Sequence, residues 1–197
     1  PLNGPAWSLF FEYIANILYA VLIRKFTSRW LAVLVFLAAC ALIHQCYTQG
    51  NNIGGWTLDV EQCRVGLTRL MFPFFGGLLL FRLCKPGRVR HGFWWCSLLL
   101  VGALAMPHVG GAENFRLNGL YDAFCIIVIF PAVVFLGASD IPGDISSRAS
   151  RFLGNISYPL YITHYPIVYL YLAWVHDAEV PFSRALPVAV GVLFICI

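Results

Sequence analysis

Apolar residues run along this chain in seven long stretches, separated by short polar segments. The stretches cover about residues 7–26, 30–47, 65–84, 92–106, 120–138, 152–175 and 184–197. A helix needs about 17–25 apolar residues to cross a bilayer core, and in lipid each backbone polar group needs an internal partner. The apolar runs are continuous and lack the alternation of a membrane β-barrel. The pattern therefore predicts an all-α, polytopic membrane helix bundle with about seven transmembrane helices, of which the fourth is short and the seventh is truncated.

Composition and charge support this interpretation. Of the 197 residues, 60% are hydrophobic and only 11% are charged, whereas soluble domains are about a quarter charged. Nine of the 13 Lys and Arg residues fall in or beside the alternate loops near 24–29, 82–90 and 148–151. Excess Lys and Arg mark the cytoplasmic side, so residues 1–6 are expected on the outer side. The net charge of +4 thus indicates topology and not nucleic-acid binding.

The ends of the chain and its cysteines say less about the fold than the apolar pattern does. The chain begins without Met and stops inside an apolar run, so we expect a fragment of a longer protein. None of its seven cysteines forms a C-x-x-C pair, and most fit the role of small apolar residues. Cys46 and Cys63 flank one loop, and a disulfide between them stays open.

One carboxylate lies inside the first apolar stretch. Glu12 is about five residues into that stretch, where an unpaired charge is costly. Ionisable residues at membrane depth are functional by default, which favours a place in a polar cavity. The alternative is a helix-packing carboxylate paired with a neighbour such as Arg69.

The sixth stretch carries a histidine near its middle. His164 stands between Pro159 and Pro166, which are expected to bend the helix. Tyr158, Tyr161 and His164 follow at spacings of three, so they share much of one helix face. Leu or Phe would serve simple packing there, so this face favours a functional site over packing. The other four histidines lie in or near loops, where we expect them to be solvated or interfacial.

Several further residues have two possible roles. Arg69 belongs to the site or extends to the interface, and Asn3 and Ser8 belong to the site or cap the first helix. Trp7 fits the aromatic belt, and Asp122 fits the start of a helix. The basic loop 82–90 suits a phosphorylated donor, although orientation alone explains its charge. No phosphate loop, nucleophile elbow or metal-spaced cluster appears, so we expect no metal site.

Two motifs carry a resemblance to a known family. Residues 3–12, NGPAWSLFFE, resemble the N-x-x-x-W-S-L-x-x-E motif of the membrane acyltransferase 3 family. Residues 152–164, FLGNISYPLYITH, resemble its later L-G-x-I-S-Y-x-L-Y-L-x-H motif, and Arg69 through Arg82 resembles the intervening R-x-x-x-x-F-x-x-G helix. Both outer motifs occur in the family's order and span nearly the whole chain.

The resemblance implies a fold and an activity. It implies that residues 1–197 are the C-terminal two-thirds of one acyltransferase domain of about ten helices, in a bacterial inner membrane. It implies transfer of an acyl group, often acetyl, from acyl-CoA to a carbohydrate hydroxyl, without a bound cofactor. The family's catalytic histidine is expected before residue 1, so the fragment should not be active alone.

The implied site assigns roles to residues of this chain. Glu12 and His164 are expected to be catalytic, and the substrate-binding residues are expected to be Asn3, Trp7, Ser8, Arg69, Tyr158 and Tyr161. The competing interpretations are a transporter or flippase of lipid-linked sugars, which also uses broken helices and buried charges, and a non-catalytic membrane scaffold.

Overall fold

The computed structural model describes residues 6–22, 27–57, 59–85, 87–111, 113–141, 143–177 and 180–196. Its helices are α1 (Ala6–Leu22), α2 (Ser28–Gln49), α3 (Val60–Leu83), α4 (Gly92–Ala105), α5 (Phe115–Phe124), α6 (Phe130–Ala138), α7 (Asp144–Asp177) and α8 (Phe182–Cys196). A π-helical turn, η1 (Cys125–Ile129), joins α5 to α6 in one continuous helix. The two short strands are β1 (Val89–Arg90) and β2 (Asp140–Ile141). The predicted all-α class is confirmed, and each predicted stretch contains a helix.

Length and hydropathy single out three helices that are suited to crossing a membrane: α2, α3 and the continuous helix from Phe115 to Ala138. Shorter apolar helices lie within α1, α4 and α8. Although α7 has 34 residues, its tyrosines, prolines and histidine lower its mean hydropathy, and it is not among the three. The seven crossings therefore stay a prediction.

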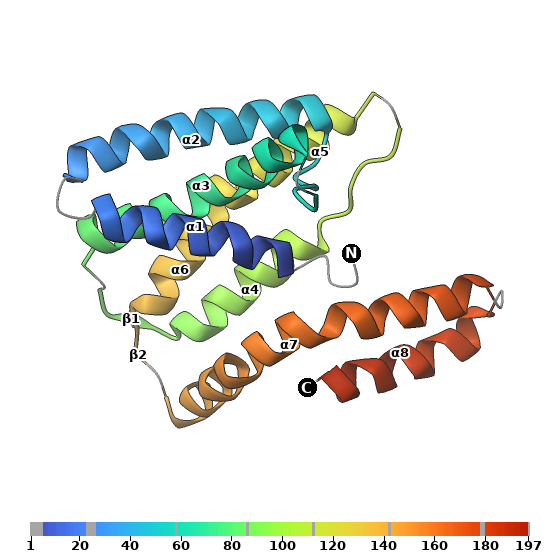
Figure 1. Cartoon of the computed structure of the whole chain (residues 1–197). Coiled ribbons are helices and arrows are strands. Elements are labelled where there is room, and N and C mark those ends of the chain that lie inside the picture. The colour runs from blue at the N-terminus through green and yellow to red at the C-terminus, as the bar shows by residue number, and fades with distance from the viewer. Residues whose placement is uncertain are drawn as a thin grey trace. The chain divides into compact units, whose positions relative to one another are not determined.

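The chain divides into two compact units, and Figure 1 labels the helices of each. One unit contains residues 8–143, and the other contains residues 1–7 and 144–197. In the larger unit, α2 packs against both α3 and α5, while α4 packs along α6. Its core cluster is formed by small and apolar side chains of three helices: Ala38, Leu42, Cys46, Phe72 and Ala123.

Two glycines allow the close packing of α2 on α5. A Cβ at Gly119 would overlap the Cys46 carbonyl, so only glycine fits at this crossing. Gly50 ends α2 with φ of 71°, a left-handed conformation that favours glycine. A Cβ at Gly50 would also lie 2.5 Å from Cδ2 of Phe115. The end of α2 and the start of α5 are thereby held together.

The π-helical turn lies immediately before a proline. The Phe130 N–H bonds to the Cys125 carbonyl five residues back. The ring of Pro131 would clash with the carbonyl four residues before it in a regular α-helix. The wider turn relieves this clash and keeps α5 and α6 continuous, which the sequence pattern did not predict.

In the smaller unit, α7 and α8 form a helical hairpin. The Tyr171 hydroxyl donates to the Ala185 carbonyl at 3.0 Å, which links the two helices. Ala185 is buried at this contact. The apolar stretch predicted at 152–175 is much shorter than the helix that contains it, because α7 already begins in the polar segment at Asp144.

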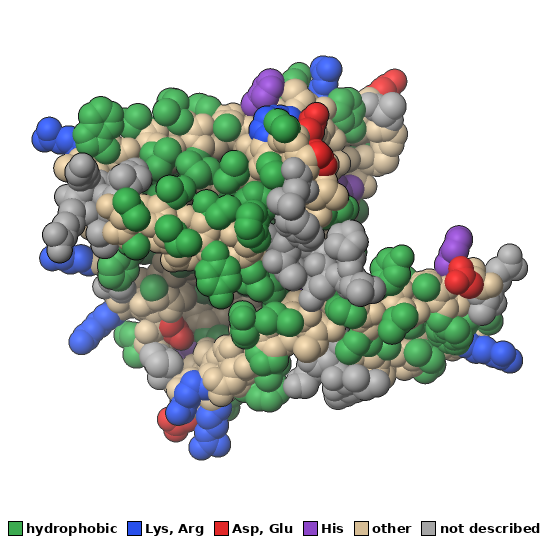
Figure 2. Space-filling model, in the orientation of Figure 1, with side chains coloured by type: hydrophobic (Ala, Val, Ile, Leu, Met, Phe, Trp, Pro, Cys, Tyr) green, Lys and Arg blue, Asp and Glu red, His purple; other side chains and the backbone are tan. Residues whose placement is uncertain are grey.

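Basic side chains gather without acidic ones where α2 begins, whereas acidic and basic side chains lie together at the other end of the larger unit (Figure 2). Basic residues lie where α2 begins and where α3 ends, including Arg29, Arg82 and Lys85. The opposite end carries Asp59 and Glu61 at the start of α3. This difference follows the charge bias of the predicted loops.

Candidate functional site

His164 lies in the middle of α7 with one ring nitrogen engaged. Its Nδ1 is 2.7 Å from the Leu160 carbonyl oxygen. A carbonyl only accepts hydrogen bonds, so Nδ1 carries the hydrogen in this contact. Within the described part of the chain, Nε2 has no hydrogen-bond partner, so it is available to accept a proton or a hydrogen bond from a substrate.

The aromatic surroundings of His164 include Tyr161. The Tyr161 ring centroid lies 6.2 Å from that of His164, with the planes tilted by 44°. The Tyr158 side chain is 61% exposed and has no ring contact with His164. The three residues lie at spacings of three on one continuous helix, as predicted, and Tyr161 and His164 are in ring contact.

The prolines of α7 do not interrupt the helix, which continues from Asp144 to Asp177. Near Pro159, side-chain hydroxyls satisfy backbone carbonyls: Ser157 Oγ donates to Gly154 O at 2.8 Å, and Thr163 Oγ1 donates to Pro159 O at 2.8 Å. These are local side-chain bonds to carbonyls within the same helix; the carbonyls that Pro159 and Pro166 leave without a helical donor are those four residues before each proline. His164 therefore projects from a continuous helix.

Glu12 lies on an exposed face of α1. Its backbone carbonyl accepts a hydrogen bond from Asn16 Nδ2 at 2.8 Å. Among the described residues its carboxylate forms no ion pair, and the guanidinium of Arg69 instead donates to the Gly54 carbonyl. The alternative in which Glu12 pairs with Arg69 is therefore wrong, because Arg69 is turned to the loop that precedes its own helix.

The first motif is only partly described. Asn3 lies outside the described residues, and of Trp7 only the helical backbone is described. Ser8 is half-buried inside the first turn of α1, because the helix already includes Ala6. Ser8 is therefore not an N-cap, and the capping interpretation is wrong for it.

A second group of polar residues gathers where α2 and α5 meet. The Asp122 carboxylate accepts from the Asn52 backbone N–H at 3.3 Å and lies 3.5 Å from Nε2 of His108. Asp122 is in the third turn of the helix that begins at Phe115, so its predicted role at a helix start is wrong. The carboxylate instead connects the loops that contain Asn52 and His108.

We call Asn52, Arg69, His108 and Asp122 the polar cluster. Cys46 lies within electrostatic reach of both Asp122 and Arg69, which locates the two charges around the end of α2. Gln45 is only 2% exposed, yet neither its Nε2 nor its Oε1 has a hydrogen-bond partner. The buried Oδ1 of Asn52 is also without a partner. A buried polar group without a hydrogen-bond partner lowers the free energy of unfolding by about 1–3 kcal/mol.

The sequence pattern revealed neither the polar cluster nor the buried Gln45, for an identifiable reason. Gln45 lies in the second apolar stretch, and a polar residue there was the available signal. The burial of Gln45 and the contact between Asn52 and Asp122, which are 70 residues apart, depend on tertiary packing that no single stretch encodes.

The basic loop 82–90 is fixed to the end of α6. Ser139 is buried, and its Oγ accepts from the Gly87 N–H at 3.0 Å while its carbonyl accepts from the Val89 N–H at 2.8 Å. The Gly92 N–H donates to Asp140 Oδ1 at 2.7 Å. β1 and β2 pair in parallel at this point. Arg88 and Arg90 are thus exposed on an ordered loop.

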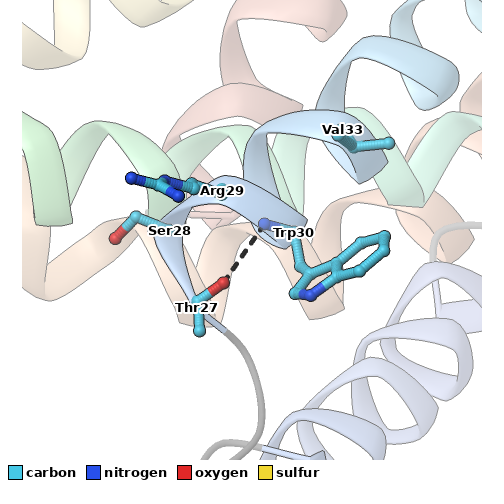
Figure 3. A pocket seen from close by; sticks show the side chains of 5 residues that line it. All are labelled: Thr27, Ser28, Arg29, Trp30 and Val33. Atoms are coloured by element: carbon cyan, nitrogen blue, oxygen red, sulfur yellow. Dashed lines mark hydrogen bonds between the residues drawn. The ribbon is translucent and has the colours of Figure 1, made fainter.

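Two hollows offer less chemistry. Figure 3 shows one beside the start of α2, lined by Thr27, Ser28, Arg29, Trp30 and Val33. Its lining side chains come from one turn and the N-cap, where Thr27 Oγ1 accepts from the Trp30 N–H at 3.4 Å. An exposed Trp next to Arg is typical of a membrane interface. The other hollow, of about 130 Å³, lies between α3 and the helix η1–α6 and has an apolar lining that includes Pro73 and Pro131.

The described residues include cysteines and potential metal ligands. Cys46 and Cys63 are both free thiols, so the disulfide left open between them is not formed. In the part of the chain that the structure describes, His, Cys, Asp and Glu form no group of three or more that could hold a metal.

Comparison with known proteins identifies a family. Residues 1–197 match the model of the acyltransferase 3 family, which is described as an acyltransferase domain. No curated protein and no solved structure matches the chain. The match covers both units and all the candidate residues.

Proposed function

The chain belongs to the acyltransferase 3 family, and from this premise we propose that it acylates a carbohydrate hydroxyl of a cell-surface polysaccharide or glycoconjugate. A membrane acyltransferase is what the family match and the apolar helices support. The proposed donor is acyl-CoA, with acetyl as the acyl group. The observation that carries the proposal is the match over the whole chain, together with an imidazole nitrogen available on α7.

The proposed reaction exchanges one acyl bond for another. The acceptor oxygen attacks the thioester carbonyl, the C–S bond breaks, and the hydroxyl proton passes through a general base to the thiolate of CoA. That base is expected upstream of residue 1. His164 and the tyrosines Tyr158 and Tyr161 would line the acceptor passage or hold the donor, and Glu12 would orient or charge-balance the base.

The basic loop supports a position for the donor. Lys85, Arg88 and Arg90 are exposed on the segment that Ser139 and Asp140 hold in place. CoA carries phosphate groups, which Arg binds well. In the proposed topology this loop faces the cytoplasm, where acyl-CoA is made, and residues 1–6 face outward across a bacterial inner membrane.

The test is acyl-CoA turnover by membranes that contain the full-length protein. Glu12→Gln and His164→Ala should abolish transfer of radiolabelled acetyl from acetyl-CoA to cell-surface carbohydrate, while the protein still inserts into the membrane. His176→Ala and Glu113→Gln are matched controls at exposed positions and should retain wild-type turnover. Full activity in both Glu12→Gln and His164→Ala would refute the residue roles.

The same assay separates the competing classes. A transporter or flippase of lipid-linked sugars would move its substrate without consuming acyl-CoA. A scaffold would tolerate apolar replacement of Glu12 and His164 and show neither activity. Wild-type membranes that release no CoA would therefore refute the acyltransferase proposal itself.

A further inference from the structure

We propose that the apolar hollow between α3 and η1–α6, here called the α3–α6 groove, binds a fatty-acyl chain of a phospholipid with an anionic headgroup. The headgroup lies on the basic loop 82–90, at one end of the groove. The inference goes beyond the proposed function, because it assigns a lipid partner to a surface outside the two outer motifs that contain Glu12 and His164.

The lining of the groove is the first observation. The groove has a volume of about 130 Å³, and each side chain that the structure shows in its lining is apolar. Pro73, Leu80 and Val134 are among these side chains. An apolar cavity of about 150 Å³ stays dry and takes up apolar molecules. The lining side chains therefore favour a hydrocarbon chain over a sugar, to which they offer no hydrogen bond.

Small residues and prolines keep the groove open. Gly76 and Gly77 lie on the α3 wall, and a Cβ at Gly77 would meet nothing within 4 Å. Pro131, on the opposite wall, follows the π-helical turn. Val134 is 60% exposed, so the groove opens onto the surface of the larger unit. A chain can therefore enter the groove from the side.

The two walls of the groove are suited to a bilayer. α3 and the continuous helix Phe115–Ala138 are two of the three helices that are long and apolar enough to cross a membrane. The α3 wall extends from Phe72 to Leu80, which is about 12 Å at 1.5 Å per residue. This length exceeds that of an acetyl group, so the groove fits a long lipid chain better than the acyl group of the proposed donor.

Basic charge lies at the end of the groove where α3 and α6 both stop. The loop after α3 reaches the end of α6, because the Gly87 N–H donates to Ser139 Oγ at 3.0 Å. Lys85 and Arg88 are exposed on this loop, and the carboxylate of the neighbouring Asp140 is engaged by a backbone N–H. Lys and Arg near the bilayer surface attract anionic lipids. The loop therefore favours a headgroup with net negative charge.

The experiment measures lipid binding to the full-length protein by native mass spectrometry from detergent, without acyl-CoA. The probes are dioleoyl phosphatidylglycerol, which is anionic, and dioleoyl phosphatidylcholine, which has the same chains and no net charge. The wild type should half-saturate at a lower concentration of phosphatidylglycerol than of phosphatidylcholine. Gly77→Leu should raise both half-saturating concentrations about tenfold, which corresponds to the exclusion of about two methylene groups.

A second variant separates the headgroup from the chain. Lys85→Gln should raise the half-saturating concentration of phosphatidylglycerol about fivefold, which corresponds to the attraction between one Lys and an anionic lipid surface. It should leave binding of phosphatidylcholine unchanged. The matched control is Arg148→Gln, which removes an exposed charge from α7 and should bind both lipids like the wild type.

Matched variants also separate binding from folding. Without lipid, Gly77→Leu should melt at or above the wild-type temperature, because its side chain has space and Leu is favoured over Gly in helices. Gly102→Leu is the control in α4, where a Cβ also meets nothing within 4 Å. It should bind both lipids like the wild type.

Four outcomes would overturn the inference. The wild type binds phosphatidylglycerol no better than phosphatidylcholine, or Gly77→Leu binds both lipids as well as Gly102→Leu does. Gly77→Leu keeps phosphatidylglycerol but melts below the wild type without lipid, which would show that a protein segment covers the groove. Gly77→Leu keeps phosphatidylglycerol but binds hexanoyl-CoA, a third probe, more weakly, which would show that the groove holds the acyl chain of the donor.

Discussion

The environment of His164 and the polar cluster are built in different ways. His164 Nδ1 donates to the carbonyl of Leu160, four residues back on its own helix, and the ring neighbour Tyr161 is three residues away. In the polar cluster, the Asn52 N–H reaches Asp122 across 70 residues of sequence, and Arg69 reaches Gly54 across 15. One region is local and depends on a single helix, whereas the other exists only when three helices and two loops pack together.

The two regions should therefore respond differently to substitution. A side chain that is oriented by its own helix keeps its geometry as long as that helix forms. A cluster from distant segments loses its geometry as soon as one crossing shifts. Substitution of His164 should therefore change the rate of acyl transfer with little effect on folding, and substitutions at the α2–α5 crossing should change both.

The largest expected effect is on transfer, from His164→Asn. Asn places a donor close to the position of Nδ1, so it can keep the bond to Leu160 O while Nε2 is lost. We expect acetyl transfer to fall by about 10–10²-fold, which corresponds to the loss of a substrate hydrogen bond of about 1.5–3 kcal/mol, with the melting temperature unchanged. Acetyl-CoA turnover and thermal unfolding in detergent are the two measurements.

The matched control for this prediction is His176→Asn, at an exposed position near the end of the same helix. It should retain wild-type turnover. Equal turnover in wild type and His164→Asn would show that Nε2 of His164 is not needed for acyl transfer.

The next effect is on stability, from Gly119→Ala. The new Cβ would overlap the Cys46 carbonyl, and forcing a methyl into a packed contact costs about 1–3 kcal/mol. The free energy of unfolding should fall by that amount, as measured by denaturant or thermal unfolding in detergent.

Gly154→Ala in α7 is the contrast. A Cβ at Gly154 meets nothing within 4 Å, and Ala is favoured over Gly in helices by up to about 1 kcal/mol. This variant should be as stable as the wild type or more stable. If Gly119→Ala were also neutral, the difference between the two regions would not hold.

The same contrast explains how far the sequence could be interpreted. The apolar stretches predicted a helix in each of seven segments, and α4, expected at 92–106, is found at Gly92–Ala105. Tyr161 and His164 could be joined from spacing alone, because they belong to one helix. Glu12 and Arg69 could not be judged in this way, since the partner of Arg69 is a loop carbonyl that has no sequence signal.

The misassigned residues have a common physical cause. Asp122 and Ser8 were interpreted from their distance to an expected helix start, and both starts lie earlier in the chain than the apolar pattern suggests. The first turn of α5, which contains Arg116 and Asn118, forms helix without hydrophobic periodicity. The buried state of Gln45 and the π-helical turn before Pro131 likewise depend on tertiary packing and on one steric clash.

A smaller effect is expected from Tyr171→Phe, which tests the helical hairpin of α7 and α8. The variant removes the hydroxyl that donates to Ala185 O at 3.0 Å and leaves that carbonyl without this donor. The free energy of unfolding should fall by about 0.5–1.5 kcal/mol. Thermal unfolding measures the change, and Tyr169→Phe, whose side chain is 62% exposed, should melt like the wild type.

The smallest effect concerns pH at the start of α3. Asp59 is the N-cap of α3, with Oδ1 accepting from the Gln62 N–H at 2.9 Å. The Thr57 hydroxyl and then the Gln62 N–H hold the pKa of the Asp59 carboxyl below its ordinary value. The folded state therefore releases this proton more readily than the unfolded state, whose Asp pKa is about 3.9. The stabilisation is present above that pH and is lost as the pH falls through the lower pKa of the folded state.

Asp59→Asn also caps a helix but does not titrate. The wild type should therefore melt at a slightly higher temperature than Asp59→Asn near neutral pH, and the two melting temperatures should converge in acid. Thr57→Val should move the convergence to higher pH, because it removes the largest cause of the lowered pKa. A difference between wild type and Asp59→Asn that stays constant from neutral pH to pH about 3 would show that the Asp59 charge does not contribute to the cap.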